Sequence, residues 1–121
     1  MSQLSNNNLE ERTAKFGENI IFLCKTLKPN LITTPIISQL VRSSTSIGAN
    51  YMEANNASSR KDFANKIFIC KKEAQETKHW LRMLSTAIED VNVTEKLRML
   101  WKECQELTMI FQKITNTLRS K

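Results

Sequence analysis

Apolar residues recur along the chain at alternating spacings of three and four positions, which is the period of one helix face. One such stripe, in the third apolar segment, continues without a break. Its members are Phe63, Ile67, Cys70, Ala74, Thr77, Leu81, Leu84 and Ile88. Comparable stripes cross three other segments. The pattern therefore predicts four amphipathic helices, over about residues 9–28, 35–55, 60–89 and 95–119.

Residues between the stripes carry signals that end and begin helices. Pro29 stops the first helix, and Thr34 before Pro35 is typical of a capped helix start. Ser59 and Thr94 are the expected caps of the third and fourth helices. The short connections favour antiparallel neighbours, and a period averaging 3.5 favours left-handed coiling. We predict one all-α domain over residues 1–121, an antiparallel up-and-down left-handed four-helix bundle. Apart from the short connections, only the first eight and last few residues are expected to lie outside the helices.

The composition argues against an enzyme. The sequence contains 2 glycines, too few for a glycine-rich nucleotide-binding loop, and a single histidine, His79. Glu76 and His79 form a Glu-x-x-His pair, but a di-metal bundle site needs a second such pair and further inward glutamates. The serines have no histidine nearby in sequence. We therefore predict no catalytic residues, no metal and no cofactor.

Cysteine usage and hydropathy bear on the compartment. Cys24, Cys70 and Cys104 are odd in number, lack metal-ligand spacing and fall on the apolar stripes, where a thiol packs as a small apolar group. This usage favours a reducing setting. No apolar run approaches the ~18 residues of a membrane span, and the N-terminus lacks an apolar signal segment. The expected location is cytoplasmic, with no membrane partner.

The charge distribution suggests a binding surface for an anionic partner. The formal net charge is +6, and basic residues gather with an aromatic on one flank of the third helix. Such a flank can meet phosphates and a base, although a lysine-rich solvated face explains the same pattern. The candidate nucleic-acid or partner surface consists of Lys61, Phe68, Lys71, Lys72, Lys78 and Arg82.

Small and polar residues are unusually dense in the second helix. Gly48 lies within its apolar arc, where a neighbouring helix can approach closely. A polar stripe of this helix and the opposite flank of the third helix suggest a self-association surface. A tightly packed, solvated bundle, with Trp80 covering the core edge, is the competing hypothesis; the first and fourth helices mostly supply core. The candidate oligomer interface consists of Arg42, Ser43, Ser46, Asn50, Glu53, Glu73, Glu76, Trp80 and Met83.

Two stretches resemble a known family. The run from Gln39 to Ser43, continuing as Ser-Ile-Gly-Ala-Asn-Tyr-Met-Glu-Ala over residues 46–54, and Ser-Arg-Lys-Asp-Phe over residues 59–63 are similar to the 23S rRNA intervening-sequence protein family. That family is also called S23 ribosomal protein or four helix bundle protein. The resemblance implies a bacterial cytosolic bundle assembled as a homopentamer. The chain departs from a common family pattern at Ala54, where glycine is frequent.

Together these features support one functional hypothesis and one alternative. The hypothesis is a non-enzymatic homo-oligomer whose basic surface contacts RNA or DNA, or a partner bound to nucleic acid. The alternative is a protein-interaction scaffold that binds no nucleic acid. The sequence does not name the partner.

Overall fold

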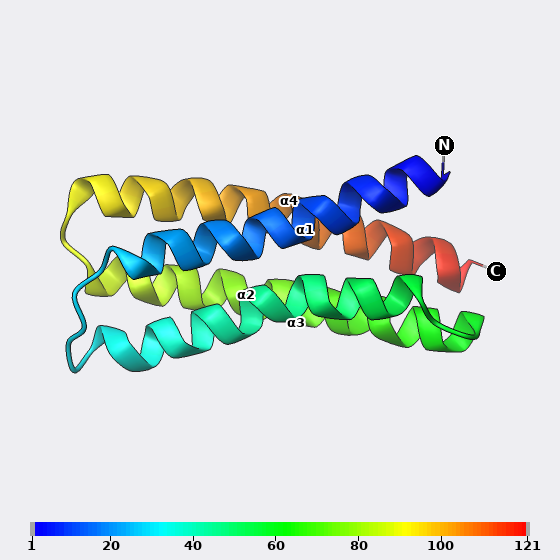
Figure 1. Cartoon of the computed structure of the whole chain (residues 1–121), viewed down its shortest axis with the longest axis horizontal. Coiled ribbons are helices and arrows are strands. Elements are labelled where there is room, and N and C mark those ends of the chain that lie inside the picture. Colours follow the sequence, from blue (N-terminus) through cyan, green and yellow to red (C-terminus); the bar gives the residue numbers. More distant parts are fainter. Residues whose placement is uncertain (1, 121) are drawn as a thin grey trace.

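The computed structural model describes residues 2–120, with side chains from Asn8 onward, and consists of four long helices (Figure 1). They are α1 (Ser2–Lys25), α2 (Thr33–Asn55), α3 (Arg60–Ala87) and α4 (Val91–Arg119). Successive helices run in opposite directions and are joined at alternating ends of the molecule. The predicted all-α up-and-down four-helix bundle is confirmed.

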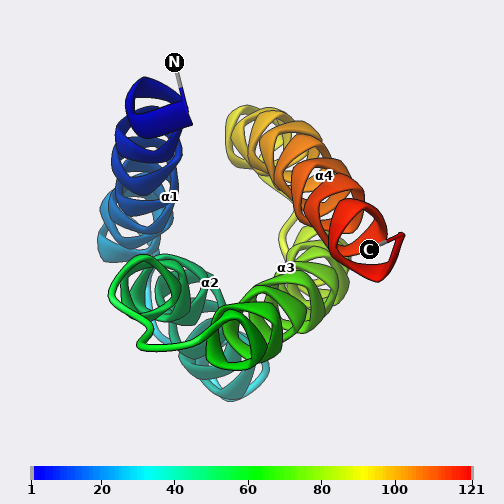
Figure 2. The same ribbon diagram turned by 90° about the vertical axis from the view of Figure 1, so that its right-hand side faces the viewer.

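Each helix packs mainly against its neighbours in the chain. The α2–α3 contact is the most extensive and the α1–α4 contact the least. In the end-on view the ribbon curves from α1 through α2 and α3 to α4 like a horseshoe (Figure 2). Across its centre, the ring of Tyr51 on α2 lies close to that of Phe111 on α4, with ring centres 6.1 Å apart. Arg12 joins the two edges by binding Glu103 and Glu106, each at 2.7 Å.

The buried side chains of α3 are those of its predicted stripe. From α3, Ile67, Cys70, Ala74, Leu81 and Leu84 are all at most 1% exposed, together with Thr77. Phe63 and Ile88, at the two ends of the stripe, are half-buried. Removing this apolar area from water is the main driving force for helix association. Among the described residues, no helix is long and apolar enough to cross a membrane.

Helix ends confirm one predicted cap and correct two. Ser59 accepts a hydrogen bond from the backbone N–H of Asp62 at 3.0 Å, as predicted. Thr34 and Thr94 already lie inside their helices. The N-cap of α2 is Ile32, which makes no side-chain cap, and Asn30, three residues before the helix, accepts from the N–H groups of residues 32 and 33. The N-cap of α4 is Asp90, which accepts from the N–H groups of residues 92 and 93. A short side chain just before the first turn reaches two free N–H groups.

The first helix is longer than predicted. It begins at Ser2, so the expectation that residues 2–8 lie outside the helices is wrong. The apolar stripe begins at Leu9, and the preceding turns are polar, which is why periodicity alone gave no sign of them. Met1 and Lys121 lie outside the described residues.

A close approach of α1 to α2 and two buried thiols provide further contacts between helices. A Cβ added at Gly48 would lie 3.4 Å from Thr13 Oγ1, so α1 and α2 approach closely there, as predicted. The thiol of Cys70 donates to the carbonyl of Ile47, and that of Cys104 to the carbonyl of Ala74. Burial raises the pKa of both thiols to about 12. They therefore remain protonated and inert at neutral pH, and each joins two helices.

Candidate nucleic-acid interface

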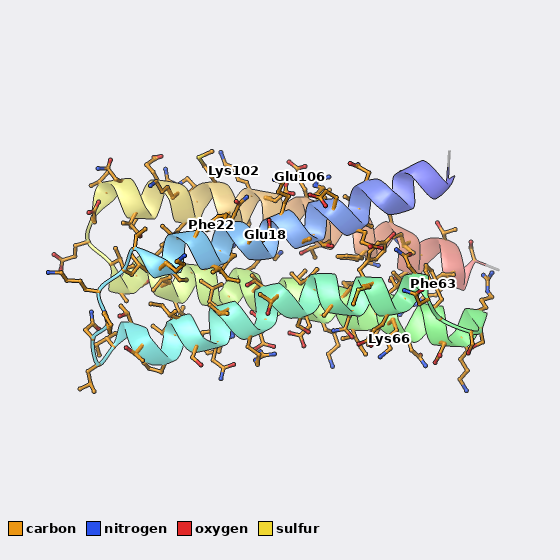
Figure 3. The ribbon with its side chains drawn as sticks, viewed as in Figure 1. Glu18, Phe22, Phe63, Lys66, Lys102 and Glu106 are labelled. Carbon is orange, nitrogen blue, oxygen red and sulfur yellow. The ribbon has the colours of Figure 1, made fainter. Side chains whose placement is uncertain are left out.

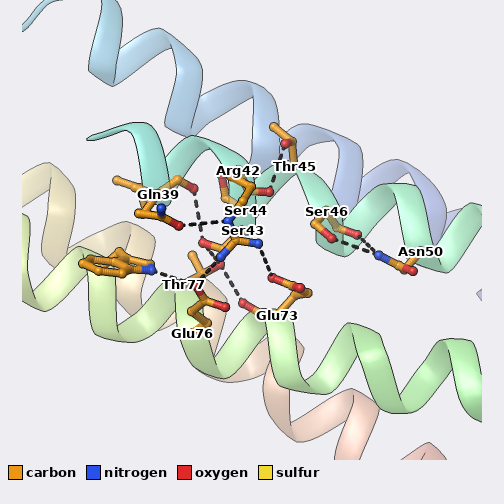
Figure 4. Close-up of polar contacts among 12 residues, drawn as sticks. Gln39, Arg42, Ser43, Ser44, Thr45, Ser46, Asn50, Glu73, Glu76 and Thr77 are labelled. Atoms are coloured by element: carbon orange, nitrogen blue, oxygen red, sulfur yellow. Dashed lines mark hydrogen bonds and ion pairs between the residues drawn. The ribbon is translucent and has the colours of Figure 1, made fainter. Parts of the chain in front are cut away.

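The α2–α3 seam carries a polar cluster of four residues, Arg42, Glu73, Glu76 and Trp80. Figure 4 shows the first three. The Arg42 guanidinium donates to Glu73 at 3.2 Å and also to Glu76. Trp80 Nε1 donates to the same Glu76 oxygen at 3.0 Å. These bonds from Trp80 and Arg42 lower the pKa of Glu76, and the bond to Glu76 raises the pKa of Arg42. These four residues, all assigned to the predicted oligomer interface, therefore pair their polar groups with one another within the chain.

Ser43 corrects the predicted oligomer interface. Its side chain is 0% exposed and accepts a hydrogen bond from Thr77 Oγ1 at 2.9 Å, inside the α2–α3 seam. A side chain without accessible surface cannot contact a second subunit. A small residue is required here because the two helices are in close contact. Its spacing along the second helix assigned Ser43 to the polar stripe, but the broad α2–α3 contact also buries positions beside the apolar stripe.

The other predicted interface residues keep some exposed surface. Asn50 donates to the Ser46 hydroxyl and carbonyl at 2.9 Å. Glu53 pairs with Lys66 of α3 at 2.6 Å, and Met83 is half-buried. Figure 3 shows Lys66 on α3, near Phe63. These residues lie along one seam, and whether a second copy contacts them stays a prediction.

Two of the predicted basic residues reach from α3 onto α4. Lys71 Nζ donates to Gln112 Oε1 at 3.2 Å and lies 5.1 Å from the centre of the Phe68 ring. Lys78 Nζ donates to Gln105 Oε1 and lies 5.4 Å from the centre of the Trp101 ring. The remaining predicted members are exposed on α3; they are Lys61, Phe68, Lys72 and Arg82.

The basic surface continues onto α4 as a groove that the sequence did not predict. We call this the α3–α4 groove; its volume is about 610 Å³. Its lining residues are Leu81, Arg82, Ser85, Thr94, Leu97, Arg98, Trp101 and Lys102. The sequence does contain a sign of this surface: beside the apolar stripe of the fourth helix, Arg98, Trp101 and Gln105 are spaced by three and four.

The α3–α4 groove is electropositive because its cations are matched by few carboxylates. None of its lining residues is acidic, and Arg82 and Lys102 form no ion pair within the described residues. Arg98 has an exposed contact with Glu95 at 3.5 Å, a geometry that contributes little. The acids Glu103 and Glu106 bind Arg12 at the α1–α4 edge instead. Figure 3 shows Lys102 and Glu106 one turn apart on α4.

A second groove lies between α1 and α4 and is mainly apolar. It has a volume of about 410 Å³ and includes Phe22 and Met99, which are 60% and 70% exposed. Figure 3 shows Phe22 on α1. The expectation that the first and fourth helices mostly supply core is therefore incomplete, since both also expose large apolar side chains.

The described residues contain no cluster suited to metal chemistry. No group of three or more histidine, cysteine, aspartate or glutamate side chains that could hold a metal ion occurs among them. His79 is exposed and meets the edge of Trp80, with ring centres 4.9 Å apart. The Glu76–His79 pair thus lies outside the bundle core.

The architecture places the chain in the class of small all-α four-helix bundle proteins. Residues 6–113 match the 23S rRNA-intervening sequence protein family, and the chain belongs to that family. A similar solved structure is a protein of unknown function from the S23 ribosomal protein family of Bacteroides thetaiotaomicron VPI-5482. It is 30% identical, the match covers 92% of this chain and 97% of that one, and the TM-score is 0.75. No curated protein matches the chain.

Proposed function

We propose that this protein is a non-enzymatic, homo-oligomeric protein that binds nucleic acid through the α3–α4 groove. The observation that carries this proposal is the gathering of Arg82, Arg98 and Lys102 around Trp101, on a surface without lining carboxylates. The predicted residues Lys71, Lys72 and Lys78 extend the positive surface along α3. The family to which the chain belongs is consistent with this role but does not specify it.

Electrostatics favours a polyanion as the partner. Cations that neutralise backbone phosphates release condensed counterions, so affinity depends steeply on salt. Lys71 and Lys78 are already held in place by glutamine and aromatic partners, which reduces the side-chain entropy lost on binding. The net charge of +6 also favours association with nucleic acid over binding of a basic protein.

The direct test is binding of a fluorescently labelled RNA or DNA oligonucleotide by the purified protein, measured by anisotropy. We expect binding at low salt, with an affinity that falls about 10- to 1,000-fold between 50 and 200 mM salt if three to six phosphates are contacted. No binding of either nucleic acid at 20 mM salt would contradict the proposal. Partner capture that survives nuclease treatment would then favour the scaffold alternative.

The proposed assembly uses exposed apolar surface that one bundle leaves uncovered. Phe22 and Met99 line the same α1–α4 groove, and large exposed side chains of this kind are typical of subunit contacts. The family resemblance makes a pentamer the expected form. The strip at Trp80 and Met83 is a second candidate contact, although most of its polar groups are paired within the chain.

Light scattering checks the assembly. At micromolar concentration we expect a mass that is a multiple of 14.0 kDa, five-fold for a pentamer. The double variant Phe22→Ser, Met99→Ser should shift the protein toward the monomer, because both side chains are exposed and contribute little to the single bundle. The matched control is Met109→Ser, another methionine of α4 that is 61% exposed but does not line this groove. A monomeric wild-type protein would contradict the proposed assembly.

A further inference from the structure

Trp101 occupies an unusual position in the α3–α4 groove. It is 38% exposed, so much of its ring is accessible, and it lines the groove between the two helices. Lys78 Nζ lies over the ring, 5.4 Å from its centre, and the residues that line the groove include Trp101 but not Lys78. The result is a fixed aromatic surface at the wall of a cationic groove.

The surroundings of the ring suit a planar, partly apolar ligand that carries negative charge. Leu81 and Leu97, each 1% exposed, supply apolar lining, and Ser85 and Thr94 supply small hydroxyl side chains. Arg82, Arg98 and Lys102 complete the lining. A volume of about 610 Å³ falls within the usual range for small-molecule sites. A base with its phosphates combines these properties.

A related arrangement, with its aromatic ring on α3 instead of α4, occurs a second time along the seam. Lys71 binds Gln112 of α4 and lies over Phe68, just as Lys78 binds Gln105 of α4 and lies over Trp101. The two lysines are separated by two helical turns, about 10 Å along α3. Phe68 is 43% exposed. Two aromatic surfaces therefore follow one line of cations.

A line of cations with aromatic rings beside it discriminates between single-stranded and double-stranded nucleic acid. In a duplex the bases stack on one another and present only their edges, so a half-buried ring between two helices has no base face to contact. An unpaired base presents its whole face, and sequence-tolerant binders of single strands combine aromatic rings with a basic groove in this way.

We infer that the α3–α4 groove binds single-stranded nucleic acid, with an unpaired base stacked on Trp101 and its flanking phosphates on Arg82, Arg98 and Lys102. This inference rests on the proposed function and specifies its ligand. A neighbouring segment of the strand follows the seam toward Phe68. RNA and DNA share the chemistry that the groove recognises, so the experiment uses both.

The test compares binding of labelled 20-nucleotide oligo-U, oligo-dT and a mixed-sequence 20-base-pair duplex at equal salt. We expect both single strands to bind at least 10-fold more tightly than the duplex. Trp101→Ala should weaken single-strand binding about 5- to 100-fold, the usual effect of removing one stacking ring, and leave duplex binding unchanged. Trp101→Phe should retain most of the affinity because a ring remains.

Replacing the second tryptophan, Trp80, allows base stacking to be followed by fluorescence while Trp101 stays in place. Trp80→Phe changes a residue outside the groove and makes Trp101 the only indole. Single strands should quench its fluorescence, and the duplex should not. Equal affinity for both forms, without quenching, would overturn the inference and leave the proposed nucleic-acid binding intact. Absence of all binding would overturn both.

Discussion

Replacing Arg82, Arg98 and Lys102 together by glutamine is expected to lower the affinity for an oligonucleotide by about 100-fold at low salt. Each cation contributes a charge-assisted contact to phosphate, and the three contacts lie in one groove. Removing them should also reduce the slope of log affinity against log salt by about two for a single strand. All three side chains are exposed, so the free energy of unfolding should change little.

A second triple variant separates local contacts from overall charge. Lys15, Lys25 and Lys28 are exposed in α1 or just after it, outside the α3–α4 groove. Their replacement by glutamine lowers the formal net charge of +6 by the same three units. We expect a loss of affinity below about 3-fold, because only long-range attraction changes. Equal losses in the two triple variants would show that nucleic acid binds without using the groove.

Replacing Ser43 by arginine is expected to lower the free energy of unfolding by about 3 kcal/mol or more. The side chain is fully buried where α2 and α3 make their most extensive contact, and no carboxylate accepts a bond from it. An arginine there must separate the helices or bury an unpaired charge. Urea unfolding followed by circular dichroism at 222 nm measures the loss.

The Ser43 prediction distinguishes a core position from a subunit contact. Ser38→Arg places the same charge on an exposed position of α2 and should change stability by less than about 0.5 kcal/mol. Ser43→Ala should cost about 1 kcal/mol, through the loss of one buried hydrogen bond to Thr77, and gives a folded variant if the arginine prevents folding. A Ser43→Arg protein of normal stability that fails to self-associate would place Ser43 at an oligomer interface after all.

The helices and their core were predictable because burial imposes a periodicity that the sequence must obey. The stripe from Phe63 to Ile88 specifies both the existence of α3 and the side that it buries. Caps were less predictable, since several residues near each boundary can accept the same free N–H groups. Asp90 rather than Thr94 caps α4, because its carboxylate lies just before the first turn and accepts from two free N–H groups there.

The surfaces were only half predictable because they depend on which flanks of two helices meet. The wheel of α3 found Lys71 and Lys78, but nothing in that helix alone shows that they extend toward Gln112 and Gln105. Trp101 acquires its place only through the pairing of α3 with α4. Arg42, Glu73 and Glu76 were assigned to one surface, but nothing in the sequence showed that they bind one another within the chain.

The horseshoe arrangement has a consequence for the order in which the chain folds. Neighbours in space are almost always neighbours in sequence, so most contacts close short loops, and such topologies fold quickly. The α2–α3 hairpin has the largest contact and is a natural nucleus, onto which α4 can add without waiting for α1. On a ribosome α1 emerges first but gains its main partner only when α2 has followed. Because α1 has a smaller total contact with its neighbours than α4 has, it should be the first helix to detach, as the least cooperative unit of the bundle.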